Sequence, residues 1–162
     1  NNSTLHSSST TLTYYIPPKV FCRMKKIIDK IHEAEEKKQY FYSFEYFPPK
    51  NDAAVENLLE RVERMAELEP LFVDVTWGAG GSTAALSTRI AEEAQTRGGV
   101  VSMLHITCAG LTEARAAEIL DDARARGIRN LLILRGDPVK GAPKGAWAGA
   151  FRHAARLVAL AR

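Results

Sequence analysis

The 162-residue sequence is poor in several features that mark specialised classes of protein. It has only two cysteines, Cys22 and Cys108, which are too few and too far apart for a disulfide framework or a four-ligand metal site. Charged residues interrupt each apolar stretch well before the ~20 residues that are needed to span a bilayer. These absences exclude a disulfide-stapled or membrane-spanning protein, and they favour a soluble one with ordinary thiols, in a reducing and cytoplasmic setting.

Net charge is also low. The value of +3 at pH 7 comes with no basic run, so a nucleic-acid partner is not expected. His6, His32 and His153 are scattered without ligand spacing, so no metal is expected either. What the sequence does contain is 46% hydrophobic and 25% charged residues, which is the composition of one globular domain with a real core.

Residues 1–23 differ from the rest of the chain. They contain no acidic residue, and eight Ser or Thr lie within the first thirteen positions, which predicts a disordered leader. A Ser-rich, acid-poor leader resembles an organelle transit peptide. However, arginine is absent before Arg23, and Met24 followed by two lysines is typical of a natural start. We therefore favour an upstream extension over targeting, and we assign the folded domain to residues 24–162.

From Met24 onward, helical and strand periodicity alternate. Apolar residues predict an opening helix with Ile27, Ile28, Ile31 and Ala34 on one face. A second helix is expected to begin near Asn51, a third to be capped by Ser82, and a fourth to be capped by Thr112. A last helix is expected at the end of the chain, where apolar residues return at helical spacing: Phe151, Ala154, Ala155 and Val158. Gly127 suits the left-handed position after a helix. The expected strands are 40–46, 71–76, 100–107 and 130–134.

This strict alternation predicts an α/β fold with parallel strands and right-handed crossovers. A doubly wound sheet and a TIM (β/α)8 barrel both satisfy it. Polar residues favour the barrel, because they fall at or just past the carboxyl end of every expected strand, where a barrel builds its site: Glu45, Thr76, His105, Arg135 and Asp137. A full barrel takes ~250 residues. We therefore expect only the first four or so strand-helix units, with two open edges, as in a fragment of a longer protein.

The first segment that suggests chemistry is SFEYFPPK, at 43–50. Its single carboxylate, Glu45, stands among aromatic residues at a strand end, where desolvation would suit it to act as a general acid. A rim glutamate paired with a cation is the alternative. Pro48 and Pro49, which must end the strand, and the position on the barrel rim favour the functional interpretation.

A second segment, DVTWGAGGST at 74–83, joins a strand end to a helix start through a glycine-rich turn, so backbone amides there would suit an anion. It lacks the glycine spacing of the dinucleotide fingerprint. A tight turn that needs glycine conformations is the alternative explanation.

Two further segments close the series. LHITC at 104–108 places His105 near a strand end, where a packing role and a catalytic role are both open. LRGDP at 134–138 supplies a cation, a glycine and an anion, which suit it to hold a polar ring system or a phosphate. Its Arg-Gly-Asp tripeptide also matches a cell-adhesion signal, but no apolar signal-peptide core precedes it, so we set adhesion aside.

Together, SFEYFPPK, DVTWGAGGST, LHITC and GIRNLLILRGDP at 127–138 resemble the methylenetetrahydrofolate reductase family, in the family's order. The resemblance covers residues 24–162. The segment GAFRHA at 149–154 resembles the family's next flavin-contacting block, but it departs from the usual pattern, which has a glycine pair and often a tyrosine-like residue around Ala150 and His153.

The resemblance implies a barrel that holds FAD, takes a hydride from NADH or NADPH, and reduces 5,10-methylenetetrahydrofolate to 5-methyltetrahydrofolate, in one-carbon metabolism and methionine supply. Glu45 would protonate a folate nitrogen and open its ring to an iminium ion, which Asp137 would stabilise. The residues implied for FAD are Thr76, Trp77, His105, Arg135, Gly136, Asp137, His153 and Ala154. Those implied for the nicotinamide are Glu45, Tyr46, Phe47, Pro48, Pro49 and Lys50. The full-length protein would be a homo-oligomer.

Two other classes stay open at this point. One is a flavin-free barrel enzyme, such as an aldolase or isomerase that binds phosphate. The other is an inactive truncated product that only associates with full-length subunits.

Overall fold

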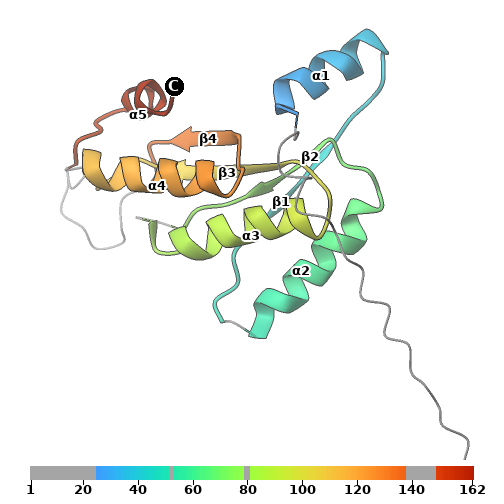
Figure 1. The fold of residues 1–162 in the computed structure, drawn as a ribbon, viewed down its shortest axis with the longest axis horizontal. Coiled ribbons are helices and arrows are strands. Elements are labelled where there is room, and N and C mark those ends of the chain that lie inside the picture. Colours follow the sequence, from blue (N-terminus) through green and yellow to red (C-terminus); the bar gives the residue numbers. More distant parts are fainter. Residues whose placement is uncertain (1–24, 52, 79–80, 138–148) are drawn as a thin grey trace, which may run out of the picture.

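The computed structural model describes residues 25–51, 53–78, 81–137 and 149–162, so the leader expected at 1–23 lies outside the described residues. Helices and strands alternate along the chain (Figure 1). Their bounds are α1 (Ile27–Glu36), β1 (Ser43–Tyr46), α2 (Ala53–Ala66), β2 (Phe72–Val75), α3 (Ala84–Thr96), β3 (Ser102–Thr107), α4 (Glu113–Ala125), β4 (Asn130–Leu134) and α5 (Ala154–Ala161).

The four strands form one parallel sheet in the order β1-β2-β3-β4. A doubly wound sheet reverses its strand order at a switch point, whereas a barrel adds each new strand beside the previous one. The sequential order is therefore that of a partial TIM barrel, and the predicted α/β class is confirmed.

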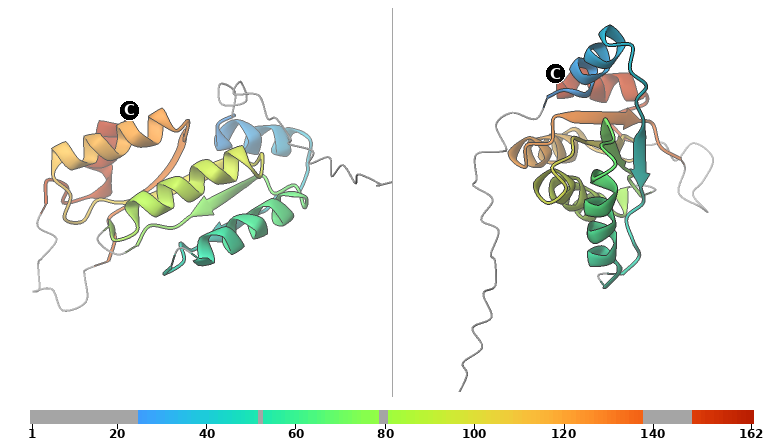
Figure 2. Two further views of the ribbon diagram at one scale, coloured as in Figure 1. Left: turned by 60° about the horizontal axis from the view of Figure 1, so that its bottom comes forward. Right: turned by 90° about the vertical axis from the view of Figure 1, so that its right-hand side faces the viewer.

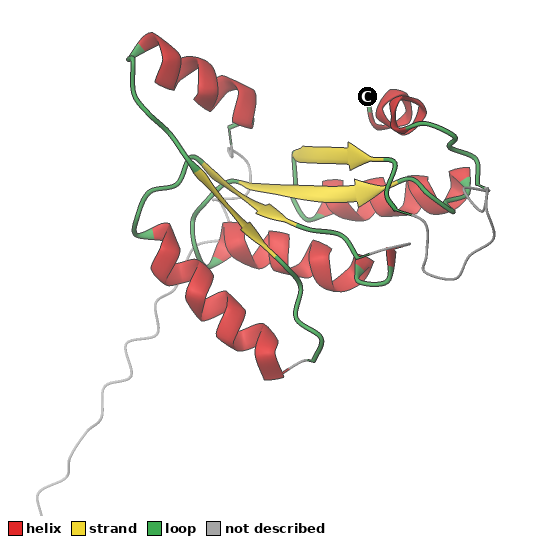
Figure 3. Ribbon diagram, turned by 180° about the vertical axis from the view of Figure 1, so that it is seen from behind, coloured by secondary structure: helices red, strands yellow, loops and turns green. Residues whose placement is uncertain are grey.

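Helices α2, α3 and α4 cover one face of this sheet, and Figure 2 shows the same layering from two other directions. The core between the layers is apolar and well sealed, with Leu59, Val75, Ile90 and Leu104 at 0 or 1% exposure. Because side chains alternate along a strand, the residues between these core positions point to the opposite face. Figure 3 shows that opposite face, which α2, α3 and α4 leave uncovered.

Helix α1 lies across the amino ends of the strands. The backbone N–H of Ile27 donates to Asn130 Oδ1 at 2.9 Å, and Lys30 Nζ donates to the carbonyl of Leu71, the residue before β2. Asn130 Nδ2 also donates to the carbonyl of Ser102 at 3.4 Å, which joins the starts of β3 and β4. This end of the sheet is therefore occupied by its own chain, which leaves the carboxyl ends for a site.

Several local predictions are confirmed. The Thr112 side chain accepts the first-turn N–H of Arg115 at 3.2 Å, and Gly127 has a φ of 72°. The predicted cap at Ser82 is wrong, because α3 begins at Ala84 and Thr83 holds the cap position without capping. The Thr83 hydroxyl instead accepts from the N–H of Gly78 at 2.8 Å, so it closes the preceding turn.

The limits of several elements also differ from the prediction: β2 is Phe72–Val75 rather than 71–76, and β3 begins at Ser102 rather than at residue 100. Strand β1 begins at Ser43 rather than at residue 40, and the pairing starts where the Leu71 N–H donates to the carbonyl of Tyr42 at 2.9 Å. In α5 the buried residue is Leu157, while Ala155 is exposed. Phe151 is buried but precedes the helix, so its position does not share the helical period.

Tyr46 provides a test of the core. Its hydroxyl is buried and has no hydrogen-bond partner among the described residues, which is unfavourable, so Tyr46→Phe is expected to raise the free energy of unfolding by about 1 kcal/mol. Tyr42→Phe is the matched control, because the Tyr42 hydroxyl donates to the carbonyl of Leu68 and its removal is expected to stabilise nothing. Urea unfolding at pH 7 measures both variants.

The same tyrosine predicts a dependence on alkaline pH. Burial raises the pKa of Tyr46 in the folded state, so its unfolded form ionises first, near pH 10. Stability is therefore unaffected by this group below about pH 10 and falls as the pH rises above it. Wild type is expected to lose stability above pH 10 more steeply than Tyr46→Phe, and parallel curves would contradict the burial of this hydroxyl.

Candidate functional site

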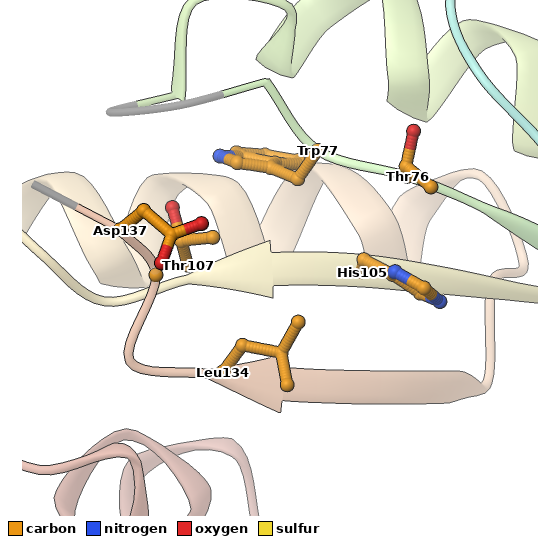
Figure 4. A pocket seen from close by; sticks show the side chains of 7 residues that line it. Thr76, Trp77, His105, Thr107, Leu134 and Asp137 are labelled. Atoms are coloured by element: carbon orange, nitrogen blue, oxygen red, sulfur yellow. The ribbon is translucent and has the colours of Figure 1, made fainter. Parts of the chain in front are cut away.

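A pocket of about 230 Å³ lies at the carboxyl ends of three adjacent strands, β2, β3 and β4 (Figure 4). It is smaller than the ~300–1,000 Å³ of a typical site for a whole drug-sized ligand. It therefore suits part of a larger molecule. The lining residues are Thr76, Trp77, His105, Thr107, Leu134, Gly136 and Asp137.

The chain after β2 is held in place by two hydroxyl groups, one in α3 and one on the residue just before it. The Gly78 N–H donates to Thr83 Oγ1 at 2.8 Å, Thr83 Oγ1 lies 3.0 Å from Ser87 Oγ, and Ser87 Oγ donates to the carbonyl of Thr76 at 2.8 Å. This relay fixes the backbone on both sides of Trp77. Trp77 is only 8% exposed, so its ring forms a positioned wall of the pocket.

The chain after β4 stays paired with the chain after β3. The Cys108 N–H donates to the carbonyl of Leu134 at 2.9 Å, and the Ala109 N–H donates to that of Arg135 at 3.0 Å. Cys108 Sγ lies 3.8 Å from the Arg135 carbonyl, and burial raises the pKa of its thiol. Cys108 is therefore a packing residue, and the pairing places the Arg135 backbone at the carboxyl edge of the sheet.

Gly136 lets this segment turn into the pocket. Its φ is 85°, in the left-handed region, and a Cβ at this position would lie 2.7 Å from the Cβ of Thr107. Both the conformation and the close approach require glycine. The turn places Asp137 at one end of the pocket, beside Thr107 (Figure 4).

His105 enters the pocket from β3. Its Nε2 lies 3.2 Å from Asp74 Oδ1, and both residues are 8% exposed. The sequence left a packing role and a catalytic role open for His105. Because His105 lines the pocket, it can contact a ligand as well as pack.

Among the described residues, two polar groups at the pocket are buried without a hydrogen-bond partner: Trp77 Nε1 and Thr107 Oγ1. Buried polar groups in proteins are nearly always hydrogen-bonded, so orphaned ones in a pocket wall indicate a missing partner. The indole N–H can only donate, and a hydroxyl can donate or accept. A ligand that pairs with the Trp77 indole would therefore carry a hydrogen-bond acceptor.

Five of the eight residues expected to contact a flavin line this one pocket: Thr76, Trp77, His105, Gly136 and Asp137. The other three do not line it. Arg135 directly follows β4 and is exposed, while His153 and Ala154 lie at the amino end of α5. Sequence reasoning missed Thr107 and Leu134, although the two-residue period from His105 to Thr107 identifies Thr107 as sharing its face.

The segment 45–50 lies on β1 and just after it, outside the pocket lining. Glu45 pairs in register with Asp74, so it shares the face that carries the pocket. The expected desolvation of Glu45 is wrong for the described residues: Glu45 is exposed, because β1 is the edge of the sheet and Phe47, at 70% exposure, does not cover it. Tyr46 points the other way, into the core.

Other kinds of site find no support in the part of the chain that the structure describes. Within it, no three His, Cys, Asp or Glu side chains gather as metal ligands would. None of its helices has the length and apolar character that crossing a membrane requires.

Comparison with known proteins gives a consistent family. A family model described as methylenetetrahydrofolate reductase matches residues 30–162. The chain is 45% identical over 119 residues to methylenetetrahydrofolate reductase (NADH) 1 of Arabidopsis thaliana, covering 74% of this chain and 20% of that protein. It is 41% identical over 138 residues to methylenetetrahydrofolate reductase 1 of Schizosaccharomyces pombe, covering 85% of this chain and 23% of that one.

A third relative, a probable methylenetetrahydrofolate reductase (NADPH) of Caenorhabditis elegans, is 40% identical over 114 residues, which are 67% of this chain and 17% of that protein. The chain thus spans about a fifth of the length of these relatives. The family match across the domain, the sequential parallel sheet and the pocket at its carboxyl edge agree, and the chain belongs to the methylenetetrahydrofolate reductase family.

Proposed function

We propose that this chain forms the flavin-facing portion of an enzyme that reduces 5,10-methylenetetrahydrofolate to 5-methyltetrahydrofolate with NADH or NADPH. The observation that carries the proposal is the pocket at the carboxyl ends of β2, β3 and β4. It gathers five residues of three separate motifs that resemble the family's flavin contacts. Relatives named for NADH and for NADPH leave the reductant open between the two.

The residues of the pocket fit part of an FAD molecule. A cavity of about 230 Å³ suits a ring portion rather than the whole dinucleotide. A flavin ring carries carbonyl and ring-nitrogen acceptors, which match Trp77 Nε1 and Thr107 Oγ1, two groups that have no partner in the part of the chain that the structure describes. Gly136, without a side chain, lets the backbone approach such a ring closely. When bound, FAD would supply hydride transfer between the nicotinamide and the folate.

The protein's own contribution is orientation and charge. Trp77 forms one wall and Asp137 lies at one end of the same pocket, so a planar ring bound there would lie near both (Figure 4). The carboxylate of Asp137 would stabilise positive charge that develops on the folate during reduction, an electrostatic role that grows as water is excluded.

Glu45 is the proposed proton donor to the folate nitrogen. It lies on the same face as the pocket, in register with Asp74, but it is exposed in the described residues. General acid catalysis favours a drier environment than this. We therefore further propose that the active enzyme continues the sheet beyond its edge strands, β1 and β4, and so encloses Glu45.

An absorbance experiment under anaerobic conditions tests the proposal. The purified protein is supplied with FAD, and NADH or NADPH is added, followed by 5,10-methylenetetrahydrofolate. We expect flavin absorbance that bleaches with the nicotinamide and recovers with the folate.

Each other outcome favours a different class. A folded protein that binds no flavin, but acts on a phosphorylated substrate, would contradict the proposal in favour of a flavin-free barrel enzyme. A folded protein without flavin or activity, which co-purifies with full-length reductase subunits, would favour a non-catalytic product.

A further inference from the structure

We infer that Asp74 is a positioning residue that holds His105 in one tautomer, with a proton on Nε2 and a free lone pair on Nδ1 facing the pocket. The identity of the ligand rests on the proposed function. The first test, which determines the His105 tautomer, needs no ligand. Asp74 belongs to none of the positions that the sequence analysis assigned to FAD, folate or nicotinamide.

The placement of Asp74 is the first step. In β2 its neighbours Val73 and Val75 point into the core beneath the helices, at 1% and 0% exposure. Alternation therefore puts Asp74 on the opposite face of the sheet, where His105 and the pocket also lie. A carboxylate that is 8% exposed on this face needs a strong partner, since a buried charge without one is costly.

The partner is His105. Its Nε2 lies 3.2 Å from Asp74 Oδ1, and no Lys or Arg of the described residues forms an ion pair with Asp74. Glu45 and Met103 are its register neighbours, so the nearest positions across the sheet offer another acid and an apolar side chain rather than a cation. The carboxylate is therefore directed to the histidine.

A carboxylate can only accept a hydrogen bond, so the proton in this contact must come from Nε2 of the ring. In the neutral imidazole, the other nitrogen is then an acceptor. Within the described residues no hydrogen bond to Nδ1 is found, and His105 lines the pocket. Nδ1 thus offers a lone pair to an N–H or O–H donor of the ligand.

This assignment complements the rest of the pocket. Trp77 Nε1 can only donate, so the wall across the pocket suits acceptors, whereas His105 in this tautomer suits a donor. A heterocycle with both an N–H and carbonyl oxygens, such as the ring system of a flavin, carries both kinds of group. A fixed tautomer makes His105 selective for that pattern.

The test is a long-range proton-nitrogen NMR spectrum of the chain labelled with ¹⁵N-histidine, at a pH where the His105 ring is neutral. A His105→Gln variant identifies the signal among the four histidines. We expect the wild type to show the Nε2–H tautomer. A wild-type His105 ring with its proton on Nδ1, or with a mixture of both tautomers, would overturn the inference, whatever the Asp74→Asn variant shows.

Asp74→Asn is the second arm, because an amide can donate to the ring nitrogen and reverse the tautomer. We expect the Nδ1–H form to appear in this variant and the affinity for FAD to fall by about tenfold, as for one lost hydrogen bond. Asp121→Asn is the matched control, since Asp121 is an exposed acid of α4, and it is expected to change neither measurement.

The outcomes separate the inference from the proposed function. An unchanged tautomer in Asp74→Asn would contradict the positioning role, and a reversed tautomer with unchanged FAD affinity would contradict the contact between Nδ1 and the ligand. A wild type that binds no FAD would contradict the proposed function, while the tautomer of the wild type and of Asp74→Asn still decides the role of Asp74.

Discussion

Replacing Gly136 with alanine is expected to lower the free energy of unfolding by about 3 kcal/mol. The left-handed φ of 85° contributes ~1–2 kcal/mol of this with any side chain. The remainder is overpacking, because the new Cβ would lie 2.7 Å from the Cβ of Thr107, and relief requires β3 and the turn after β4 to separate. Urea unfolding measures the loss, and a fall in FAD affinity is expected with it.

Gly99→Ala is the control that separates strain from crowding. Gly99 also has a positive φ, of 65°, but a Cβ there would meet nothing within 4 Å. Its replacement is expected to cost only about 1 kcal/mol, from backbone strain alone. Equal losses for the two variants would show that the contact between Gly136 and Thr107 is not tight.

Replacing Glu45 with glutamine is expected to slow the reduction of methylenetetrahydrofolate by ~10²–10⁴-fold, the usual contribution of a general acid. Glutamine keeps the shape of the side chain but cannot release a proton. Bleaching of the flavin by NADH needs no proton on the folate, so this first half-reaction is expected to stay within a few-fold of wild type. Anaerobic stopped-flow absorbance measures the two steps separately.

Glu60→Gln, at an exposed position of α2, controls for the loss of one negative charge and is expected to leave both steps unchanged. A Glu45→Gln enzyme with an undiminished folate step would assign the proton to another group. A variant slowed equally in both steps would indicate a role for Glu45 in binding rather than in proton transfer.

The sequence predicted the order of elements because its signals are local. Apolar periodicity marked each helix, and Thr112 and Gly127 occupy the cap and left-handed positions that their chemistry favours. The predicted cap at Ser82 was wrong because Thr83 holds the cap position, and only the folded turn shows that the Thr83 hydroxyl accepts from Gly78 instead. Such competition between equivalent hydroxyl contacts is not decided by local sequence.

The site was predictable in outline for a different reason. In a sheet of parallel strands the carboxyl ends meet at one edge, so residues at those ends gather whatever their separation along the chain. Trp77 and Asp137, which follow different strands, accordingly line one pocket. The exposure of Glu45 was not predictable, because aromatic neighbours in sequence alternate between the two faces of a strand, and Tyr46 points into the core.

The contact between Asp74 and His105 also lay beyond the sequence. The two residues are 31 positions apart, and their pairing depends on the register of β2 against β3. Sequence periodicity can place both residues on one face. It does not show that the carboxylate meets Nε2 rather than water.

The central claim is that the pocket at the carboxyl ends of β2, β3 and β4 holds the flavin, and the indole N–H of Trp77 reports on it most directly. In a proton-nitrogen NMR titration with FAD, assigned with a Trp77→Phe variant, we expect the Trp77 Nε1–H signal to shift and to saturate as its missing acceptor arrives. If FAD binds while this signal stays unmoved, the flavin lies elsewhere and the assignment of the pocket is contradicted.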